Sequence, residues 1–254
     1  MKKTKFAVLF TALMVILGLS SCLGDPDPYF TGTEIMKVKG FMGLYSFESA
    51  GKYTVEPTNA EAITSEINTE FAVVTYKYDT RTITQGASSI QGEILNLLPI
   101  NDFGFTSGEM ESNAPIHTVG ATVNFFDKTN VFINLTYYYK DSSNAADLKT
   151  ELDKHRFVIY KATAEEDPDV KDNTMVLYLN HIVADPEIND ERLSAGTETR
   201  HFDLNYVLGG SEPETIIIKF KYSSKSTMDD AKESEIRINY KSIIDQYFGN
   251  NTNI

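Results

Sequence analysis

Cysteine is nearly absent from this sequence, and tryptophan is absent altogether. Cys22 is the only cysteine in 254 residues, which excludes a disulfide framework and a thiolate metal site. Without tryptophan, a sugar-binding surface would depend on tyrosines such as Tyr137, Tyr138 and Tyr139. We expect these rings mainly in the core and at strand edges, because they alternate between the two faces of one expected strand.

Basic residues are scarce as well. The chain has 23 lysines and arginines against 36 aspartates and glutamates, which gives a net charge of −13. An acidic surface repels nucleic acid and anionic lipid headgroups. We therefore predict no nucleic-acid partner. We interpret the acidity as an aid to solubility, with a cationic partner as the alternative.

Sequence signatures of catalysis are missing. The sequence has no G-x-S-x-G nucleophile elbow and no H-E-x-x-H zinc motif, and its four histidines are dispersed: His117, His155, His181 and His201. A Ser–His–Asp triad assembled from distant segments is the remaining catalytic alternative. We predict a protein that is not an enzyme, with no cofactor and no catalytic residue.

Two groups of residues are candidates for a metal ion. His155 and His181 lie on or beside expected strands, with Asp153 and Asp185 near them in the sequence, and such ligands suit zinc. The acidic segment 165–172 offers carboxylates for calcium but lacks the Asp-x-Asp-x-Asp-Gly spacing of a calcium loop. In both groups we expect solvated or hydrogen-bonded side chains and no metal.

The N-terminus carries the strongest functional signal. Three lysines precede the apolar run 6–19, which suits a signal peptide and is short for a membrane span of about 20 residues. The run ends in the tetrapeptide L-S-S-C, whose last residue is Cys22. This tetrapeptide resembles the lipobox of bacterial lipoproteins. The resemblance implies cleavage before Cys22 and attachment of a diacylglycerol to its sulfur as a thioether.

On this interpretation, residues 1–21 are a signal peptide and residues 22–33 are an acidic tether. Stable anchoring takes more than one acyl chain, because a single chain holds only marginally. Asp25 and Asp27 loosely resemble an acidic signal for export to the outer face of the outer membrane, with an ordinary solvated linker as the alternative. We expect an outer-membrane protein anchored by lipid on Cys22, at the cell surface or on the periplasmic face.

From residue 34 onward, short apolar runs alternate with turn residues, which is typical of an all-β chain. The first series of strands is expected at 35–38, 40–47, 53–56, 71–78 and 89–98, with a short helix at 60–68. The second series is expected at 121–126, 131–139, 156–161, 174–181, 199–204, 215–222 and 234–240, with a helix at 242–248. The segment 104–118 has few apolar residues, so we expect two domains, 34–115 and 116–254.

The C-terminal half resembles the NigD-like lipoproteins. The matching pattern begins with the strand VFINLTYYY, followed by Lys154–His155 before FVIY. Asp172–Asn173 then precede a strand that ends in Leu-Asn-His. A strand with Phe202–Asp203–Leu204 and a last strand that alternates Ile and Lys complete the pattern. The family implies an N-terminal OB-like barrel followed by a C-terminal antiparallel, Ig-like β-sandwich. Asn180–His181 departs from the Arg-His-Asn order expected of the family, so only Cys22 is carried over as a functional residue.

These features favour a non-enzymatic envelope lipoprotein that acts as a binding or interaction module. Its partner would be a protein or a glycan at the cell surface, and the sequence does not indicate an oligomeric state. Two alternatives stay open. The family takes its name from a bacteriocin gene cluster, which implies immunity-type protection. A pilus or adhesin accessory subunit is the other alternative, and it predicts an edge strand that accepts or donates a strand.

Overall fold

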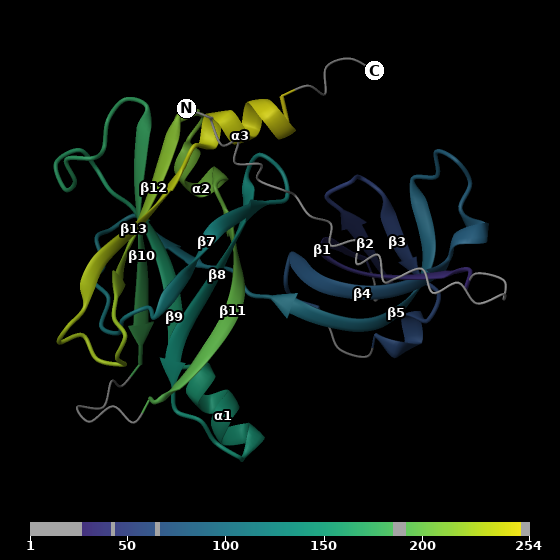
Figure 1. Cartoon of the computed structure of the whole chain (residues 1–254), viewed down its shortest axis with the longest axis horizontal. Coiled ribbons are helices and arrows are strands. Elements are labelled where there is room, and N and C mark those ends of the chain that lie inside the picture. The colour runs from purple at the N-terminus through teal and green to yellow at the C-terminus, as the bar shows by residue number, and fades with distance from the viewer. Residues whose placement is uncertain (1–26, 42–43, 64–66, 185–191, 250–254) are drawn as a thin grey trace, which may run out of the picture. The chain divides into compact units, whose positions relative to one another are not determined.

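The structure is a computed structural model that describes residues 27–41, 44–63, 67–184 and 192–249 (Figure 1). Cys22, the expected signal peptide 1–21 and the first part of the expected tether lie outside these residues. The chain divides into two compact units between Ile100 and Asn101. Among the described residues, no helix has the length and apolar character needed to cross a membrane.

The first unit is a closed five-stranded barrel. Its strands are β1 (Tyr29–Phe41), β2 (Leu44–Ser49), β3 (Thr54–Pro57), β4 (Phe71–Asp79) and β5 (Ser89–Ile100), with 3₁₀ turns at Ala60–Ala62 and Thr80–Thr82. The neighbour order is β1-β2-β3-β5-β4. The long strand β1 closes the ring, because its first part pairs with β4 and its last part with β2. Residues 29–33 of the expected tether therefore belong to this strand.

The barrel interior is filled by every second side chain of each strand, because successive side chains of a strand point to opposite faces. Along β4, for example, Ala72, Val74 and Tyr76 are buried. The interior is completed by one or two residues from each of the other strands: Met36, Phe47, Val55 and Ile94. Of the helix expected at 60–68, the described residues include the 3₁₀ turn Ala60–Ala62, and residues 64–66 lie outside the described part.

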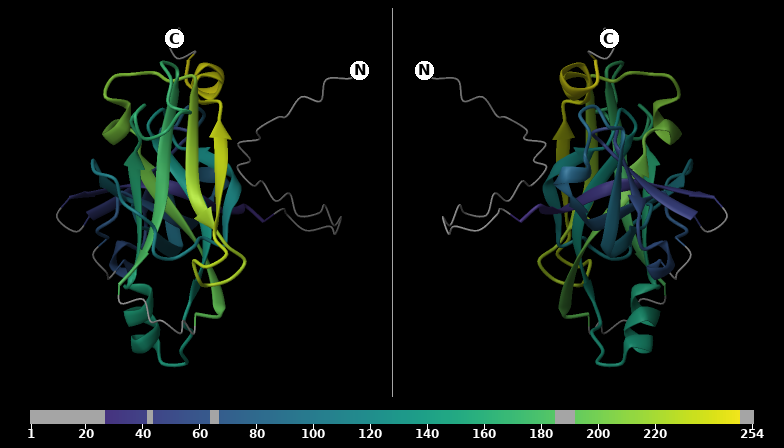
Figure 2. Two further views of the ribbon diagram at one scale, coloured as in Figure 1. Left: turned by 90° about the vertical axis from the view of Figure 1, so that its left-hand side faces the viewer. Right: turned by 90° about the vertical axis from the view of Figure 1, so that its right-hand side faces the viewer.

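The second unit consists of two packed β-sheets. The larger sheet has the order β13 (Lys232–Ile238), β12 (Thr215–Tyr222), β10 (Thr174–Val183), β9 (His155–Lys161) and β6 (Gly104–Thr106). The smaller sheet has the order β11 (Ser194–Asp203), β8 (Asn130–Tyr139) and β7 (Thr118–Phe125). Three helices complete the unit: α1 (Ala145–Leu152), α2 (Asn205–Leu208) and α3 (Tyr240–Tyr247). Figures 1 and 2 show α1 and α3 at opposite ends of this unit.

The sandwich core is built from inward-facing residues of both sheets. On β8, the expected alternation places Val131, Ile133 and Leu135 in the core, where they pack with residues of the larger sheet such as Ile159 and Leu177. A second, smaller apolar cluster lies on the outer face of the larger sheet, under the loop that follows β9: Tyr160, Ala162, Val176 and Ile217, with Val170 and Tyr178 packed against them.

The predicted all-β class, with an OB-like barrel followed by a β-sandwich, is confirmed. The sheet pairing differs in one respect from an antiparallel sandwich, since β10 runs parallel to β12 and β6 runs parallel to β9. Helix α1 and strand β6 were not expected from the sequence. Strand β6 precedes the expected boundary after residue 115, yet it pairs with β9 of the second unit. The helix expected at 242–248 is present as α3.

Candidate functional site

A buried chain of polar side chains lies inside the sandwich near α1. It consists of Glu151 in the last turn of α1, His155 at the start of β9, and His181 on β10. Asn144 fixes the start of the helix, because its side chain accepts a hydrogen bond from the backbone of Ala146. Glu151 is 6% exposed, His155 is 4% exposed and His181 is 1% exposed, so water is largely excluded from the chain.

The hydrogen-bond partners determine where the protons lie. His181 Nδ1 is 3.0 Å from the carbonyl oxygen of Pro115, which can only accept, so Nδ1 is protonated and Nε2 is an acceptor. His155 Nδ1 lies 2.9 Å from that Nε2 and donates to it. His155 Nε2 lies 3.3 Å from Glu151 Oε1 and donates to the carboxylate. Both ring nitrogens of His155 are therefore engaged inside the sandwich, one by His181 and the other by Glu151.

The carboxylate of Glu151 collects positive charge from several directions. Arg192 Nε donates to Oε1 at 2.6 Å, the backbone N–H of Lys140 donates at 3.2 Å, and Lys154 Nζ lies 3.5 Å away. Burial alone would raise the pKa of Glu151, but the hydrogen bonds from Arg192 and Lys140 outweigh it and lower the pKa to about 2. Glu151 is therefore ionised at neutral pH and balances the charge of Arg192.

The rings around the chain explain why His181 is neutral. Phe157 stacks on His181 with a centroid distance of 4.4 Å, and Tyr137 packs edge-on against it at 5.6 Å. Burial lowers the pKa of His181 to about 3, against the raising effect of the Pro115 carbonyl. A neutral His181 matches its role as acceptor from His155.

The structure brings together the two histidines that the sequence singled out for zinc, but their rings are hydrogen-bonded to each other. The facing nitrogens of this hydrogen bond are 2.9 Å apart. Asp153 is exposed and pairs with Lys149 at 2.5 Å, and Asp185 lies outside the described residues. Within the described part of the chain, no group of three or more His, Cys, Asp or Glu side chains is arranged to hold a metal ion.

The acidic segment 165–172 holds a lysine in place of a metal ion. Lys219 Nζ on β12 lies 2.8 Å from Asp167 Oδ2 and 2.8 Å from Asp169 Oδ2, and Tyr178 donates to Asp167 at 2.6 Å. Burial opposes ionisation of Asp167, yet the hydrogen bonds from Lys219 and Tyr178 lower its pKa. These contacts fasten the loop over the outer apolar cluster of the larger sheet.

The other two histidines are also hydrogen-bonded within the second unit. His201 Nδ1 lies 2.7 Å from Asp102 Oδ1 and its Nε2 lies 2.8 Å from Asn130 Oδ1. His117 Nδ1 lies 3.0 Å from the hydroxyl of Tyr138. Among the described residues, no serine hydroxyl is hydrogen-bonded to a histidine ring, so the distant triad considered from the sequence has no counterpart there.

The barrel contains a polar cluster that the sequence did not reveal. The hydroxyls of Tyr53 and Tyr76 both donate to Glu34 Oε1, and the two hydroxyls lie 2.6 Å from each other. Burial, and after it the hydrogen bond to Glu34, raises the pKa of both tyrosines. The cluster satisfies a carboxylate on an inward-facing position of β1.

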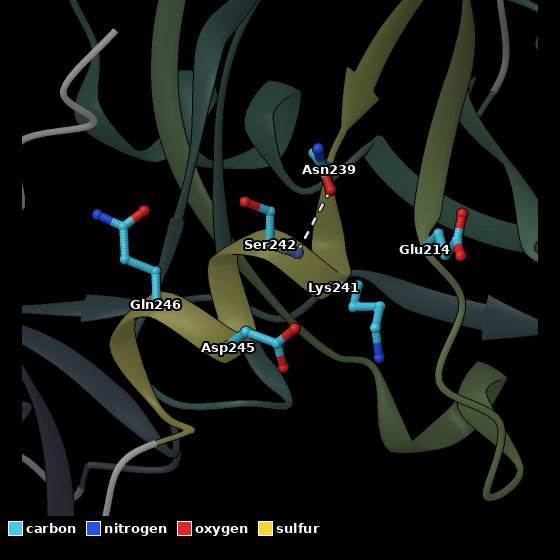
Figure 3. A pocket seen from close by; sticks show the side chains of 6 residues that line it. All are labelled: Glu214, Asn239, Lys241, Ser242, Asp245 and Gln246. Atoms are coloured by element: carbon cyan, nitrogen blue, oxygen red, sulfur yellow. Dashed lines mark hydrogen bonds between the residues drawn. The ribbon is translucent and has the colours of Figure 1, made fainter. Parts of the chain in front are cut away.

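A surface depression of about 510 Å³ lies beside the start of α3. Figure 3 shows the side chains that line it. The depression is lined by six polar or charged residues: Glu214, Asn239, Lys241, Ser242, Asp245 and Gln246. The Asn239 side chain accepts from the backbone of Ser242 and so caps the helix. The depression is wide open to solvent and brings no histidine or hydrophobic wall to a ligand.

No protein-family model and no curated protein matches this chain. Among solved structures, a candidate lipoprotein from Bacteroides fragilis superposes with a TM-score of 0.67 at 20% identity, covering 83% of this chain and 98% of that one. A NigD-like immunity protein from Bacteroides caccae gives a TM-score of 0.49 at 17% identity, covering 80% and 90% of the two chains. The match to the candidate lipoprotein from Bacteroides fragilis shows a shared fold.

Proposed function

We propose that this protein is a lipoprotein of the cell envelope, anchored through Cys22, whose two β units form a non-catalytic binding module. One observation carries this proposal: the four histidines are all hydrogen-bonded to groups of the chain itself, and three of them are buried. A general acid or base must exchange its proton with a substrate. Histidines that are engaged in this way suit a structural role and favour binding over catalysis.

The anchor is supported by the L-S-S-C sequence that ends at Cys22 and by the fold shared with the candidate lipoprotein from Bacteroides fragilis. Cys22→Ala removes the sulfur that would carry the lipid. We expect the native chain to incorporate labelled palmitate and to lose residues 1–21, and the variant to do neither. Ser21→Ala is the matched control, because it keeps a small residue beside the cleavage site and should be labelled normally. Equal palmitate labelling of the native chain and Cys22→Ala, or no labelling of either, would overturn the anchor.

Display on the outer face of the outer membrane is the finer part of the proposal, and it rests on Asp25 and Asp27. Protease treatment of intact cells should degrade the native chain and spare the Asp25→Asn, Asp27→Asn double variant. Protection of both chains from protease would place the protein on the periplasmic side. Lysed cells provide the control, because both chains should then be digested equally.

The ligand of the module is expected to be a glycan or a protein of the cell surface. The protein itself carries an excess of acidic residues, which favours neutral or cationic ligands over anionic ones. The detergent-solubilised chain can be screened on a glycan array, and photo-cross-linking on intact cells can report protein neighbours. Saturable binding to a defined glycan or protein would support the module. Failure to find saturable binding in both screens would count against it.

A further inference from the structure

The sandwich has four strands at the edges of its sheets, and they differ in how well they are protected from pairing with another chain. An unpaired strand edge offers free N–H and C=O groups and is normally blunted by charges, bulges or shortness. The closed barrel of the first unit has no such edge. The two sheets of the second unit end in β13, β6, β11 and β7.

Three of these edges are blunted. Strand β13 reads KESEIRI, with four charged residues in seven positions. Strand β6 has three residues. Strand β7 carries a shift of register against β8 between Val119 and Val123, which interrupts a regular edge.

Strand β11 has none of these protections over most of its length. All ten of its residues, Ser194–Asp203, are in register with β8 on one side. On the other side, the backbone of His201 bonds to Asn101 at 3.0 Å and to Phe103 at 2.8 Å. Since the outward direction alternates along a strand, the backbone groups of Ala195, Thr197 and Thr199 also point outward. Within the described residues, the outward N–H and C=O groups of these three residues have no backbone partner.

The open part of β11 is also firmly held and nearly uncharged. Thr197 shares a hydroxyl–hydroxyl hydrogen bond of 2.8 Å with Thr136 on β8, and Thr199 donates to the side chain of Asn134. Glu198 is the single charged residue from Ala195 to Thr199, and its carboxylate is bonded by Arg200. Ala195 and Thr197 are exposed. The edge is therefore already ordered, which lowers the entropic cost of adding a strand.

We propose that this edge pairs with the same edge of a second copy of the chain, in an antiparallel ladder centred on Thr197. In this register Thr197 faces its own copy, Ala195 faces Thr199, and Gly196 faces Glu198, so no like charges oppose one another. Moving the centre to Glu198 would place two glutamates opposite each other. The pairing has twofold symmetry and uses both open edges, so it closes at a dimer with one continuous six-stranded sheet.

Cysteine substitution in intact cells tests the register, because Cys22 is the only native cysteine. Directly opposed Cα atoms in an antiparallel ladder are about 5.5 Å apart, within reach of a disulfide. Thr197→Cys should therefore give a covalent dimer on a non-reducing gel. Ala195→Cys is the matched control on the same strand. Its two copies would be separated by about 14 Å along the ladder, so it should stay monomeric.

Ala195→Cys combined with Thr199→Cys should restore the covalent dimer, since these positions oppose each other. No dimer with Thr197→Cys, equal dimer with Ala195→Cys, or a covalent product with a different protein would each overturn the proposal. The last result would identify another strand donor as the occupant.

Sedimentation of the detergent-solubilised full chain gives a second measurement without a new thiol. The native chain should carry two protein copies per particle and Thr197→Pro one, because proline removes an outward N–H and leaves the bonds to β8. Thr197→Val keeps that N–H and should remain dimeric. A single copy for the native chain, or two copies for Thr197→Pro, would contradict the pairing.

Discussion

The second unit buries charge in two places, and the two clusters have opposite composition. Inside the sandwich, the anion Glu151 faces the cation Arg192 and the ring of His155. On the outer face of the larger sheet, the cation Lys219 faces the anions Asp167 and Asp169. The interior cluster contains His181, whose pKa is lowered to about 3 by folding from an ordinary value of 6.5, whereas the outer cluster contains no imidazole. Stability should therefore respond to mild acid through the interior cluster and not through the outer one.

The interior cluster should be the more costly one to break. Glu151→Gln keeps the shape of the side chain but removes the negative charge that pairs with Arg192. Breaking a buried ion pair typically costs about 3–5 kcal/mol, and we expect a loss in that range. Urea unfolding monitored by circular dichroism measures the free energy of unfolding. A loss below about 1 kcal/mol would show that the charge of Glu151 does not hold the interior together.

The outer cluster should cost less. Lys219→Met removes the ammonium group and leaves Asp167 with the hydroxyl of Tyr178 and the backbone N–H of Asp169. Because these donors remain and the loop lies at the surface, we expect a loss of about 2–3 kcal/mol, less than for a fully broken buried pair. Hydrogen exchange should show faster exchange in 163–173 and unchanged protection in β8. Uniformly faster exchange across the unit would contradict a local role.

The sequence predicted the strands whose apolar residues alternate. The run 131–139 alternates over nine positions, and β8 has that alternation, because one face of an antiparallel strand is buried. The closed barrel was expected from family resemblance, and its strands agree with the apolar runs. Parallel pairing of β10 with β12 was not predictable, since it depends on which distant strands become neighbours.

The interior cluster was predicted only in part. His155 and His181 were singled out, but their partner Glu151 was not, because α1 was not recognised. Its signal was present in the sequence: Asn144 is a good N-cap, and Glu151 lies four residues before His155. The proton positions could not be predicted at all, since they depend on the carbonyl of Pro115, 66 residues away from His181.

The pH dependence of stability sharpens the contrast between the clusters. His181 has a lowered pKa of about 3 in the folded chain and an ordinary pKa of 6.5 when unfolded. A lowered pKa stabilises the fold above the unfolded value, and this stability is lost as the pH falls below about 6.5. Between pH 6 and pH 5, we expect His181 to account for a loss of about 1 kcal/mol.

His181→Gln isolates this effect, because glutamine can donate to Pro115 and accept from His155 without titrating. Urea unfolding at pH 6 and pH 5 should show a smaller drop for the variant than for the native chain. Lys219→Met provides the comparison from the outer cluster and should keep the native slope. Identical slopes for His181→Gln and the native chain would mean that His181 is not held neutral.

The smallest effect is expected two residues after Glu151, at Asp153. Its carboxylate lies 2.5 Å from Lys149 Nζ, a shorter contact than the one between Glu151 and Arg192, yet the two side chains are 63% and 75% exposed. Water solvates such a pair well in either state, so Asp153→Asn should change the free energy of unfolding by less than about 0.5 kcal/mol. Urea unfolding beside Glu151→Gln makes the comparison direct. A loss as large as that of Glu151→Gln would show that distance, and not burial, decides the strength of these charge pairs.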